Sequence, residues 1–355
     1  STQTAEDYAQ ARDAIVLAAK RAPNAPRSIA LQAWQYSVEH RFADALSLAN
    51  RALAQQRDQM MALAVAADAA TELGRYDEAI EHVDRMLSVR PTLPALSRAA
   101  HLRFLHGDIE GARELANDAM QQAREGEPEA LWVRLQLSEL HAAEGNHEAA
   151  VSEVGKAAQT FPNSAAPHIQ LARLAEARGE FAQASTHYKK AAESLTTPEI
   201  VLGMLRTAVA LQDRIAMRKL VTILDGMAKL DAINGDMNAR TYADYYLIKR
   251  DIGAAKRSAM IEYARRPDIY SQSQLAWIAF SAGDIAVART HATASLSTQS
   301  SDPLIAYRAG RILMAAGDTD RGSSLVQSAL ARAPGLNASA NLRVALAVSR
   351  TRPTR

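Results

Sequence analysis

A short motif recurs along this 355-residue chain at a nearly constant interval. In one copy, Gly74 is followed by Tyr76, Asp77 and Glu78, and then by the small residue Ala79. Within three runs, small residues equivalent to Ala79 are 33 or 34 positions apart: Ala11, Ala45, Ala79 and Ala112; Ala150 and Ala184; Ala255, Ala288 and Gly322. A period sustained over this length restricts the chain to a repeat architecture, in which each unit packs on its neighbours.

Each copy of the motif predicts a helix, a tight turn and a second helix. Gly74 suits the end of the first helix, where a left-handed backbone is common. Asp77 and Glu78 then stand in the first turn of the next helix, whose dipole favours negative charge. The small Ala79 lets the two helices approach closely, and Pro91 ends the second helix. One such hairpin cannot bury its own apolar face, so the pattern predicts a stack of hairpins.

The stretch from Arg75 to Ala79, with Pro91 after it, resembles the turn and second helix of a tetratricopeptide repeat (TPR). Residues 264–277 are similar to those of a set of bacterial TPR proteins of uncharacterised function. The resemblance covers nearly the whole chain. It implies an all-α fold, a right-handed superhelix of about nine to ten helix-turn-helix repeats. It also implies a concave groove that binds an extended peptide or a helix of a partner protein.

The spacing divides the chain into three parts. We expect residues 1–25 to hold the second helix of a truncated N-terminal repeat, which leads us to expect further chain upstream. Residues 26–335 are expected to form nine repeats, and residues 336–355 a C-terminal capping helix and tail. The array is degenerate near 198–235, where Met217 or Arg218 falls at the small anchor position. Extra residues are expected at 124–128 and near Asn234. The first insertion adds four residues, which is about one helical turn, so the helix can lengthen without rotating its apolar face.

Composition narrows the class of function. Lys and Arg number 41 against 39 Asp and Glu, a net charge of +2, and no basic tract precedes the tail, so nucleic acid is not an expected partner. No apolar run approaches the roughly 18–20 residues of a spanning helix, so direct membrane insertion is not expected. There is no cysteine, hence no disulfide or thiolate metal site. Together with the start at Ser1, this slightly favours a periplasmic or other extracytoplasmic location over the cytoplasm.

The sequence predicts no enzyme. It contains no phosphate loop, dinucleotide fingerprint, nucleophile elbow or zinc-protease motif. The nine histidines are scattered, and His101 and His106 are five apart, so they do not share a helix face. Acidic pairs such as Asp77 and Glu78 recur at helix starts, where capping explains them. We therefore expect no catalytic residue, no metal site and no cofactor.

Candidate binding residues come from the first helix of each pair, which lines the concave side in TPR proteins. Aligned repeats place one set in a single column: Trp34, Asp68, His101, Glu139, Arg173, Asp244, Trp277 and Arg311. Neighbouring columns hold a second set: Arg98, Phe104, Trp132, Arg240, Tyr270, Phe280, Tyr307 and Arg308. Trp and Arg often anchor interfaces, which favours two patches, Trp34 to Arg98 and Trp277 to Arg311. The alternative is that the aromatic residues fill gaps between adjacent helices.

The predicted function is a protein-interaction scaffold that binds a peptide or helix of a protein partner. Some TPR proteins hold chaperone tails with a clamp of Lys, Arg and Asn, but the matching places hold Ala30, Trp34 and Val65, and only Arg98 fits. Two alternatives stay open. One is a structural spacer of a bacterial envelope or exopolysaccharide assembly, and the other is a ligand-sensing regulatory module of a larger protein. The sequence does not indicate the oligomeric state.

Overall fold

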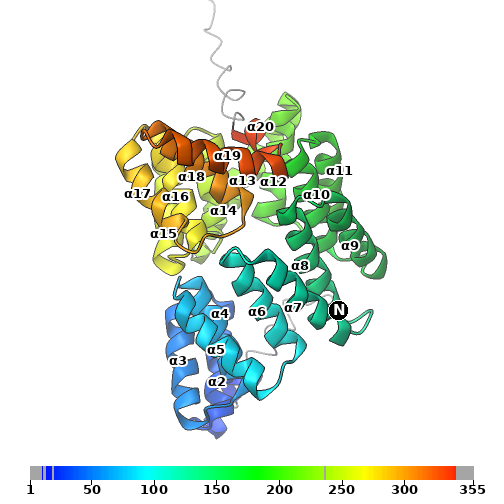
Figure 1. Cartoon of the computed structure of the whole chain (residues 1–355), viewed down its shortest axis with the longest axis vertical. Coiled ribbons are helices and arrows are strands. Elements are labelled where there is room, and N and C mark those ends of the chain that lie inside the picture. The colour runs from blue at the N-terminus through cyan, green and yellow to red at the C-terminus, as the bar shows by residue number, and fades with distance from the viewer. Residues whose placement is uncertain (1–9, 11–12, 18–19, 236, 341–355) are drawn as a thin grey trace, which may run out of the picture. The chain divides into compact units, whose positions relative to one another are not determined.

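A computed structural model describes residues 10, 13–17, 20–235 and 237–340, and over these residues the chain is built from helices (Figure 1). The helices are α2 (Pro26–Val38), α3 (Phe42–Gln55), α4 (Met60–Glu72), α5 (Tyr76–Val89), α6 (Leu93–Leu105), α7 (Ile109–Gln122), α8 (Pro128–Glu144), α9 (His147–Thr160), α10 (Ala165–Arg178), α11 (Phe181–Ser194), α12 (Pro198–Ala210), α13 (Arg214–Asn234), α14 (Ala239–Ile248), α15 (Ile252–Arg265), α16 (Ile269–Ala282), α17 (Ile285–Ser295), α18 (Pro303–Ala315), α19 (Thr319–Arg332) and α20 (Leu336–Ala340). The predicted all-α class is confirmed. Most of the expected first helix (1–25) and residues 341–355 of the expected cap and tail lie outside the described residues.

In the part of the chain that the structure describes, α2 to α19 form nine hairpins, each with a first and a second helix. Second helices also contact the first helix of the next hairpin, as α3 does with α4 and α5 with α6. The core is therefore a series of small clusters. Leu63, Met86 and Ala95, for example, form one cluster that joins α4, α5 and α6. This neighbour-to-neighbour packing is that of an α-solenoid.

The turn inside each hairpin uses one left-handed residue, as predicted for Gly74, whose φ is 67°. Five other hairpins also have glycine there, and three place His40, Gln212 or Arg250 in the same conformation, with φ of 56°, 58° and 62°. The residue after the turn often caps the second helix. Side chains of this kind accept a hydrogen bond from a first-turn N–H: Asp108, Asn146, Asp213 and Asp284.

The predicted anchors lie between the two helices of a hairpin. Each alanine anchor from Ala45 to Ala288 has no exposed surface. At Gly322 a Cβ atom would lie 2.7 Å from the carbonyl oxygen of Gly310, so α18 and α19 cross with almost no space between them. In the degenerate repeat Met217 takes the anchor position, and it shares a buried cluster with Leu205 of α12. That hairpin is packed with large side chains where the others use small ones.

Both sets of extra residues lengthen helices. α8 has 17 residues, four more than α6, and α13 has 21, against 14 for α11. The turn expected near Asn234 is the end of α13, where Gly235 has a φ of 104°. Whole helical turns preserve the direction of an apolar stripe, so α8 keeps its inward face despite the insertion.

The chain divides into two compact units. Unit 1 comprises Ser1–Val133 and Ala264–Asp268, and unit 2 comprises Arg134–Tyr263 and Ile269–Arg355. In unit 2 the last helices also contact helices far away in sequence. The Gly335 N–H donates to the Ala177 carbonyl at 2.7 Å, and Arg332 Nη1 donates to the Ala143 carbonyl at 3.1 Å. A Cβ on Gly335 would overlap the Glu176 carbonyl oxygen, so only glycine fits this contact.

Candidate partner-binding surface

One position of the first helix recurs in every hairpin. We call this set the first-helix column: Trp34, Asp68, His101, Glu139, Arg173, Arg206, Asp244, Trp277 and Arg311. The sequence prediction does not include Arg206 on α12, because Met217 interrupts the pattern of small anchors in that repeat. Its signal was present, since Arg206 follows Arg173 by 33 residues, which is one repeat length.

Polar contacts join neighbouring first helices at a separation of 30 residues. Asp68 accepts two hydrogen bonds from Arg98, at 2.8 and 2.7 Å, and Asp244 accepts one from Gln274 at 3.0 Å. Because the repeat is about 34 residues long, a residue 30 positions later lies one helical turn earlier on the next first helix. The register therefore places the two side chains of each pair opposite one another.

In unit 1 the first helices leave large apolar side chains in solvent. Trp34 on α2 is 38% exposed, and Trp132 on α8 is 64% exposed. The bidentate Asp68–Arg98 pair belongs to the same helix faces. Burial lowers the pKa of His101, against the opposing effect of the Asp68 carboxylate, so His101 is held neutral.

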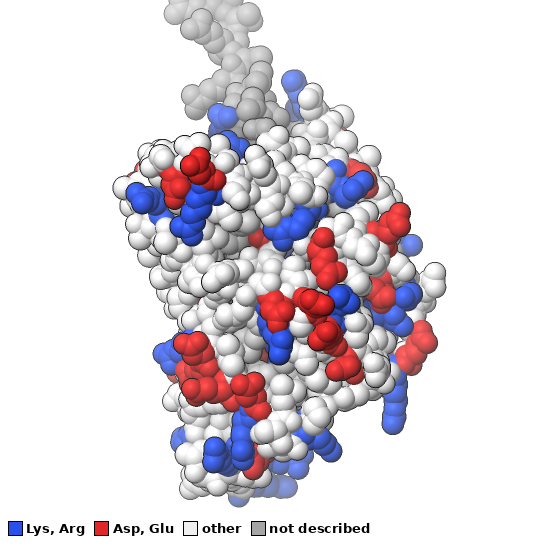
Figure 2. All heavy atoms as spheres, in the orientation of Figure 1, with Lys and Arg blue, Asp and Glu red and all other residues white. Residues whose placement is uncertain are grey.

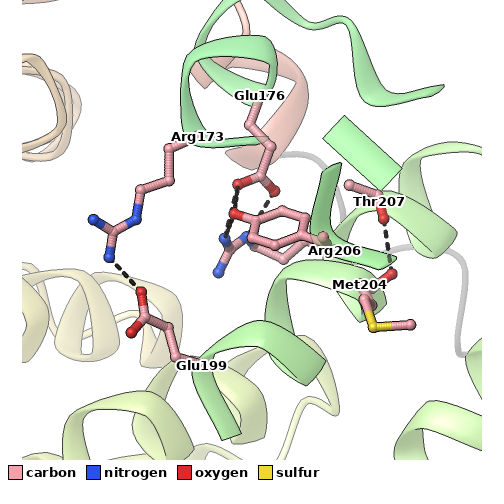
Figure 3. Close-up of polar contacts among 7 residues, drawn as sticks. Arg173, Glu176, Glu199, Met204, Arg206 and Thr207 are labelled. Carbon is pink, nitrogen blue, oxygen red and sulfur yellow. Dashed lines mark hydrogen bonds and ion pairs between the residues drawn. The ribbon is translucent and has the colours of Figure 1, made fainter. Parts of the chain in front are cut away.

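In unit 2 a network joins α10, α11 and α12 (Figure 3). Glu176 accepts hydrogen bonds from Arg206 Nε at 2.9 Å and Nη2 at 2.8 Å, and from the Tyr188 hydroxyl at 2.7 Å. Tyr188 fits because Gly203 of α12 faces its ring, where a Cβ would overlap. Burial raises the pKa of Tyr188, which stays protonated and donates its hydrogen. This saturated network fixes three helices together.

Two of the arginines predicted to line the surface, Arg173 and Arg240, are also paired within the chain. Arg173 forms an ion pair with Glu199 of α12 (Figure 3). Arg240 lies 3.0 Å from Glu262 and over the ring of Tyr270, with 5.8 Å between the guanidinium carbon and the ring centroid. Their side chains are thus already engaged before any partner arrives.

Arg308 and Arg311, near the end of the array, are also engaged with side chains of this chain. Arg308 Nη2 lies 3.5 Å from the Asp244 carboxylate, and Arg311 Nη1 donates to the Tyr307 hydroxyl at 2.9 Å. Glu139 differs from these arginines, because the residue is exposed. The protein around its carboxylate nevertheless raises its pKa through desolvation, an effect that Asp302 strengthens and Arg173 opposes. Such a carboxylate is open to water but has protein around it on most sides.

Three of the aromatic residues proposed for the surface are buried, which corrects the sequence prediction. Trp277 is 8% exposed, Tyr307 1% and Phe104 3%. The Trp277 ring packs on Phe280 and Tyr307, with centroid distances of 5.3 and 6.3 Å. A first helix packs against both its own second helix and the next first helix, so these rings fill gaps between helices. The patch from Trp277 to Arg311 is therefore largely core.

Among the described residues, no helix has the length and apolar character needed to cross a membrane. In the same part of the chain, no three or more His, Cys, Asp or Glu side chains lie close enough together to hold a metal ion.

Models described as tetratricopeptide repeat match residues 31–94, 141–205 and 273–337, together more than half of the chain. A chain of the APC/C hetero-tetramer Cut9–Hcn1 is similar in structure, with a TM-score of 0.51 and 14% identity, covering 93% of this chain and 60% of that one.

Two bacterial structures match parts of the chain. PilF of Pseudomonas aeruginosa has a TM-score of 0.46 and 17% identity, over 57% of this chain and 91% of that one. TTC0263, a TPR protein of Thermus thermophilus, has a TM-score of 0.46 and 22% identity, over 53% and 100%. No curated protein matches the sequence. The repeat period, the paired helices and the family models agree, and the chain belongs to the tetratricopeptide repeat family, whose repeats generally mediate protein–protein interaction.

Proposed function

We propose that this chain is a scaffold without catalytic activity of its own, and that unit 1 binds an extended peptide or a helix of a partner protein. The binding site is what we call the unit 1 surface: Trp34, Met61, Asp68, Arg98, His101 and Trp132. The observation that carries the proposal is the exposure of three large apolar side chains, since Met61 is 40% exposed alongside Trp34 and Trp132. Exposed apolar groups flanked by polar ones are typical of interaction sites.

The geometry of unit 2 indicates which positions on neighbouring first helices meet. Arg173 belongs to the first-helix column, and Glu199 lies seven positions before the next member, Arg206. Their side chains form an ion pair. A column residue is therefore a neighbour of the residue seven positions before the next column member.

The same pair of positions recurs twice in unit 1. Trp34 and Met61 occupy it in the first two hairpins, and His101 and Trp132 occupy it in the third and fourth. The exposed apolar side chains thus fall next to column residues on adjacent first helices. This arrangement suits a ligand that runs across several helices, as an extended peptide or a helix does.

The Asp68–Arg98 pair gives this surface a fixed polar feature. Arg98 donates Nε and Nη2 to Asp68 and Nη1 to the carbonyl of Pro94, so the guanidinium is held in one orientation. A preordered polar group costs a ligand little entropy. For a site of this size we expect a micromolar dissociation constant, which corresponds to a binding free energy of about −8 kcal/mol.

Unit 2 contributes less to binding in this proposal, because Trp277 is buried and Arg173 and Arg240 are paired. A pure spacer would have no need of exposed tryptophan on its first helices, which favours a scaffold over the spacer alternative. Location outside the cytoplasm, and the absence of nucleic acid among the partners, stay predictions.

The test is a selection of random-sequence peptides on the wild-type chain, followed by titration against variants. The double variant Trp34→Ala, Trp132→Ala should bind the selected peptides with an affinity at least about tenfold lower, since aromatic anchors dominate such sites. A matched control, Ile215→Ala with Leu230→Ala, removes two strongly exposed apolar side chains from α13 and should bind as wild type does. Equal binding by all three proteins, or loss only in the α13 variant, would contradict the proposal.

A further inference from the structure

One position of the second helices carries opposite charges in the two units. It lies two residues after the anchor, and is Glu81 in α5, Glu114 in α7, Lys219 in α13 and Arg257 in α15. In the other five hairpins the residue there is serine or threonine: Ser47, Ser152, Thr186, Thr290 and Ser324. Charge at this position is thus confined to two hairpins of unit 1 and two of unit 2.

In unit 1 this position belongs to a larger group, which we call the acidic band: Asp77, Glu81, Asp84, Glu110, Glu114 and Asp118. All six are exposed, and among the described residues none forms a side-chain ion pair or hydrogen bond. The cations of α5 and its cap are used elsewhere, because Arg85 pairs with Asp58 and Arg75 lies 3.7 Å from Glu78. None of the six carboxylates is therefore neutralised by a direct ion pair within the described residues.

In unit 2 the corresponding group is what we call the basic band: Arg218 and Lys219 on α13, Lys256 and Arg257 on α15, and Arg289 on α17. All five are exposed and, within the described part of the chain, none is in an ion pair. The carboxylates around them are already engaged. Asp213, Asp251 and Asp284 bond to backbone N–H groups, Asp225 binds Lys249 at 2.7 Å, and Glu262 binds Arg240 at 3.0 Å.

The arrangement differs from that of an ordinary surface. On the face in Figure 2, acidic and basic side chains form small groups of either sign. In the two bands the charges of one sign are left unpaired over consecutive second helices. The near-zero net charge of the chain conceals this separation, because the bands cancel in the sum.

We infer that the chain associates with itself head to tail, the basic band of one copy binding the acidic band of the next. The two bands are opposite in sign and nearly equal in number, and both include the position two residues after the anchor. An anionic membrane or a nucleic acid would neutralise only the basic band, whereas other copies of this chain can neutralise both bands. Because the contact joins two different surfaces, it is heterologous and can extend beyond a dimer.

Exposed ion pairs are individually weak, so the association is expected to depend on protein concentration and on salt. At 0.15 M ionic strength charges are screened beyond about 8 Å, and higher salt weakens the contact further. This inference goes beyond the proposed function, since it uses second helices and leaves the unit 1 surface free. The Trp34→Ala, Trp132→Ala variant should associate as wild type does.

The test is sedimentation velocity of the whole chain over a range of concentrations at low and high salt. The wild type should associate at low salt, with a dissociation constant at least about tenfold higher at high salt. Two charge-reversed variants, Glu81→Lys with Glu114→Lys and Lys219→Glu with Arg257→Glu, should each remain monomeric. Mixed together they should associate again, because each retains the native band that the other has lost.

The control is Lys189→Glu with Lys190→Glu on α11, which reverses two exposed cations outside the basic band and should associate as wild type does. Thermal melting of each variant verifies that it is folded. A wild type that is monomeric at every concentration at low salt would overturn the inference. So would a mixture of folded variants that fails to associate. A basic-band variant that associates as wild type does, but no longer binds anionic vesicles or DNA, would also overturn it.

Discussion

At the scale of single residues, identical side chains in the first-helix column meet different environments. Trp34 is partly open to solvent and Trp277 is buried, although both occupy the same position of their repeats. The residue 30 positions later explains the difference, because it lies opposite on the next first helix. It is Ala64 after Trp34 and Tyr307 after Trp277, and the large Tyr307 ring covers its partner.

The two tryptophans should therefore respond differently to truncation. Trp277→Ala should lower the free energy of unfolding by about 3–5 kcal/mol, as buried aromatic residues do. Trp34→Ala should cost less than Trp277→Ala, because 38% of the Trp34 surface is already exposed to water. Urea unfolding of the two variants measures both values. Equal costs would mean that the burial described for Trp277 is wrong.

The sequence alone located the column but not which members are exposed. Periodicity assigns a residue to a helix face, whereas burial depends on what the next repeat places opposite, as Ala64 and Tyr307 illustrate. The Glu176–Arg206 network was missed for a related reason, since Arg206 lies in the hairpin where Met217 interrupts the pattern. An alignment that continued the spacing through that hairpin would have included Arg206.

At the scale of the helical hairpin, the turn is the most constant feature. Nine hairpins in the described chain use a left-handed residue there, whether it is glycine or, as at Gln212, a residue with a Cβ. A left-handed conformation costs roughly 1–2 kcal/mol for such residues. The sequence located these turns, but it could not show that the extra residues lengthen α8 and α13, because an added helical turn leaves the apolar pattern unchanged.

The left-handed backbone of the turn predicts that replacing Gln212 by glycine stabilises the protein. Gln212→Gly removes the left-handed strain and adds flexibility to the unfolded chain, for a net gain of roughly 0.5–1 kcal/mol. The reverse change in an equivalent turn, Gly283→Ala, should cost roughly 1 kcal/mol, because φ is 85° there and no neighbouring atom obstructs the new Cβ. Thermal or urea unfolding compares the two, and a loss of stability in Gln212→Gly would contradict this account of the turn.

At the scale of the whole molecule, repeat packing explains most contacts, and the ends of unit 2 are the exception. Arg332 and Ala143 are 189 residues apart, and Gly335 and Ala177 also meet across the unit. No periodic pattern predicts a contact between distant repeats, so this feature could come only from the structure. The all-α fold and the resemblance to tetratricopeptide repeats, in contrast, could be predicted from the residues of the motif that recurs about every 34 positions.

Histidine burial predicts how stability depends on pH. Desolvation lowers the pKa of His82, His147, His168, His187 and His291, so the folded state holds fewer protons than the unfolded chain. Their contribution to stability is full above the usual histidine pKa near 6.5 and is lost as the pH falls below it.

The melting temperature should therefore fall between about pH 7 and pH 5. The stacked pair His168 and His187, with ring centroids 5.7 Å apart, makes this testable. Replacing both by glutamine should flatten the dependence, because two of the groups that resist protonation are gone. A variant that keeps the full wild-type slope would show that these two rings do not contribute to it.

The central claim is that a partner binds the exposed tryptophans of unit 1, and quenching of single-tryptophan variants by acrylamide tests it most directly. Each variant keeps one of Trp34, Trp132 and Trp277 and has phenylalanine at the other two positions. A peptide selected on the wild type should protect Trp34 and Trp132 from acrylamide and leave the already shielded Trp277 unchanged. Unchanged quenching of both exposed tryptophans while the peptide is bound would contradict the claim and move the binding site elsewhere.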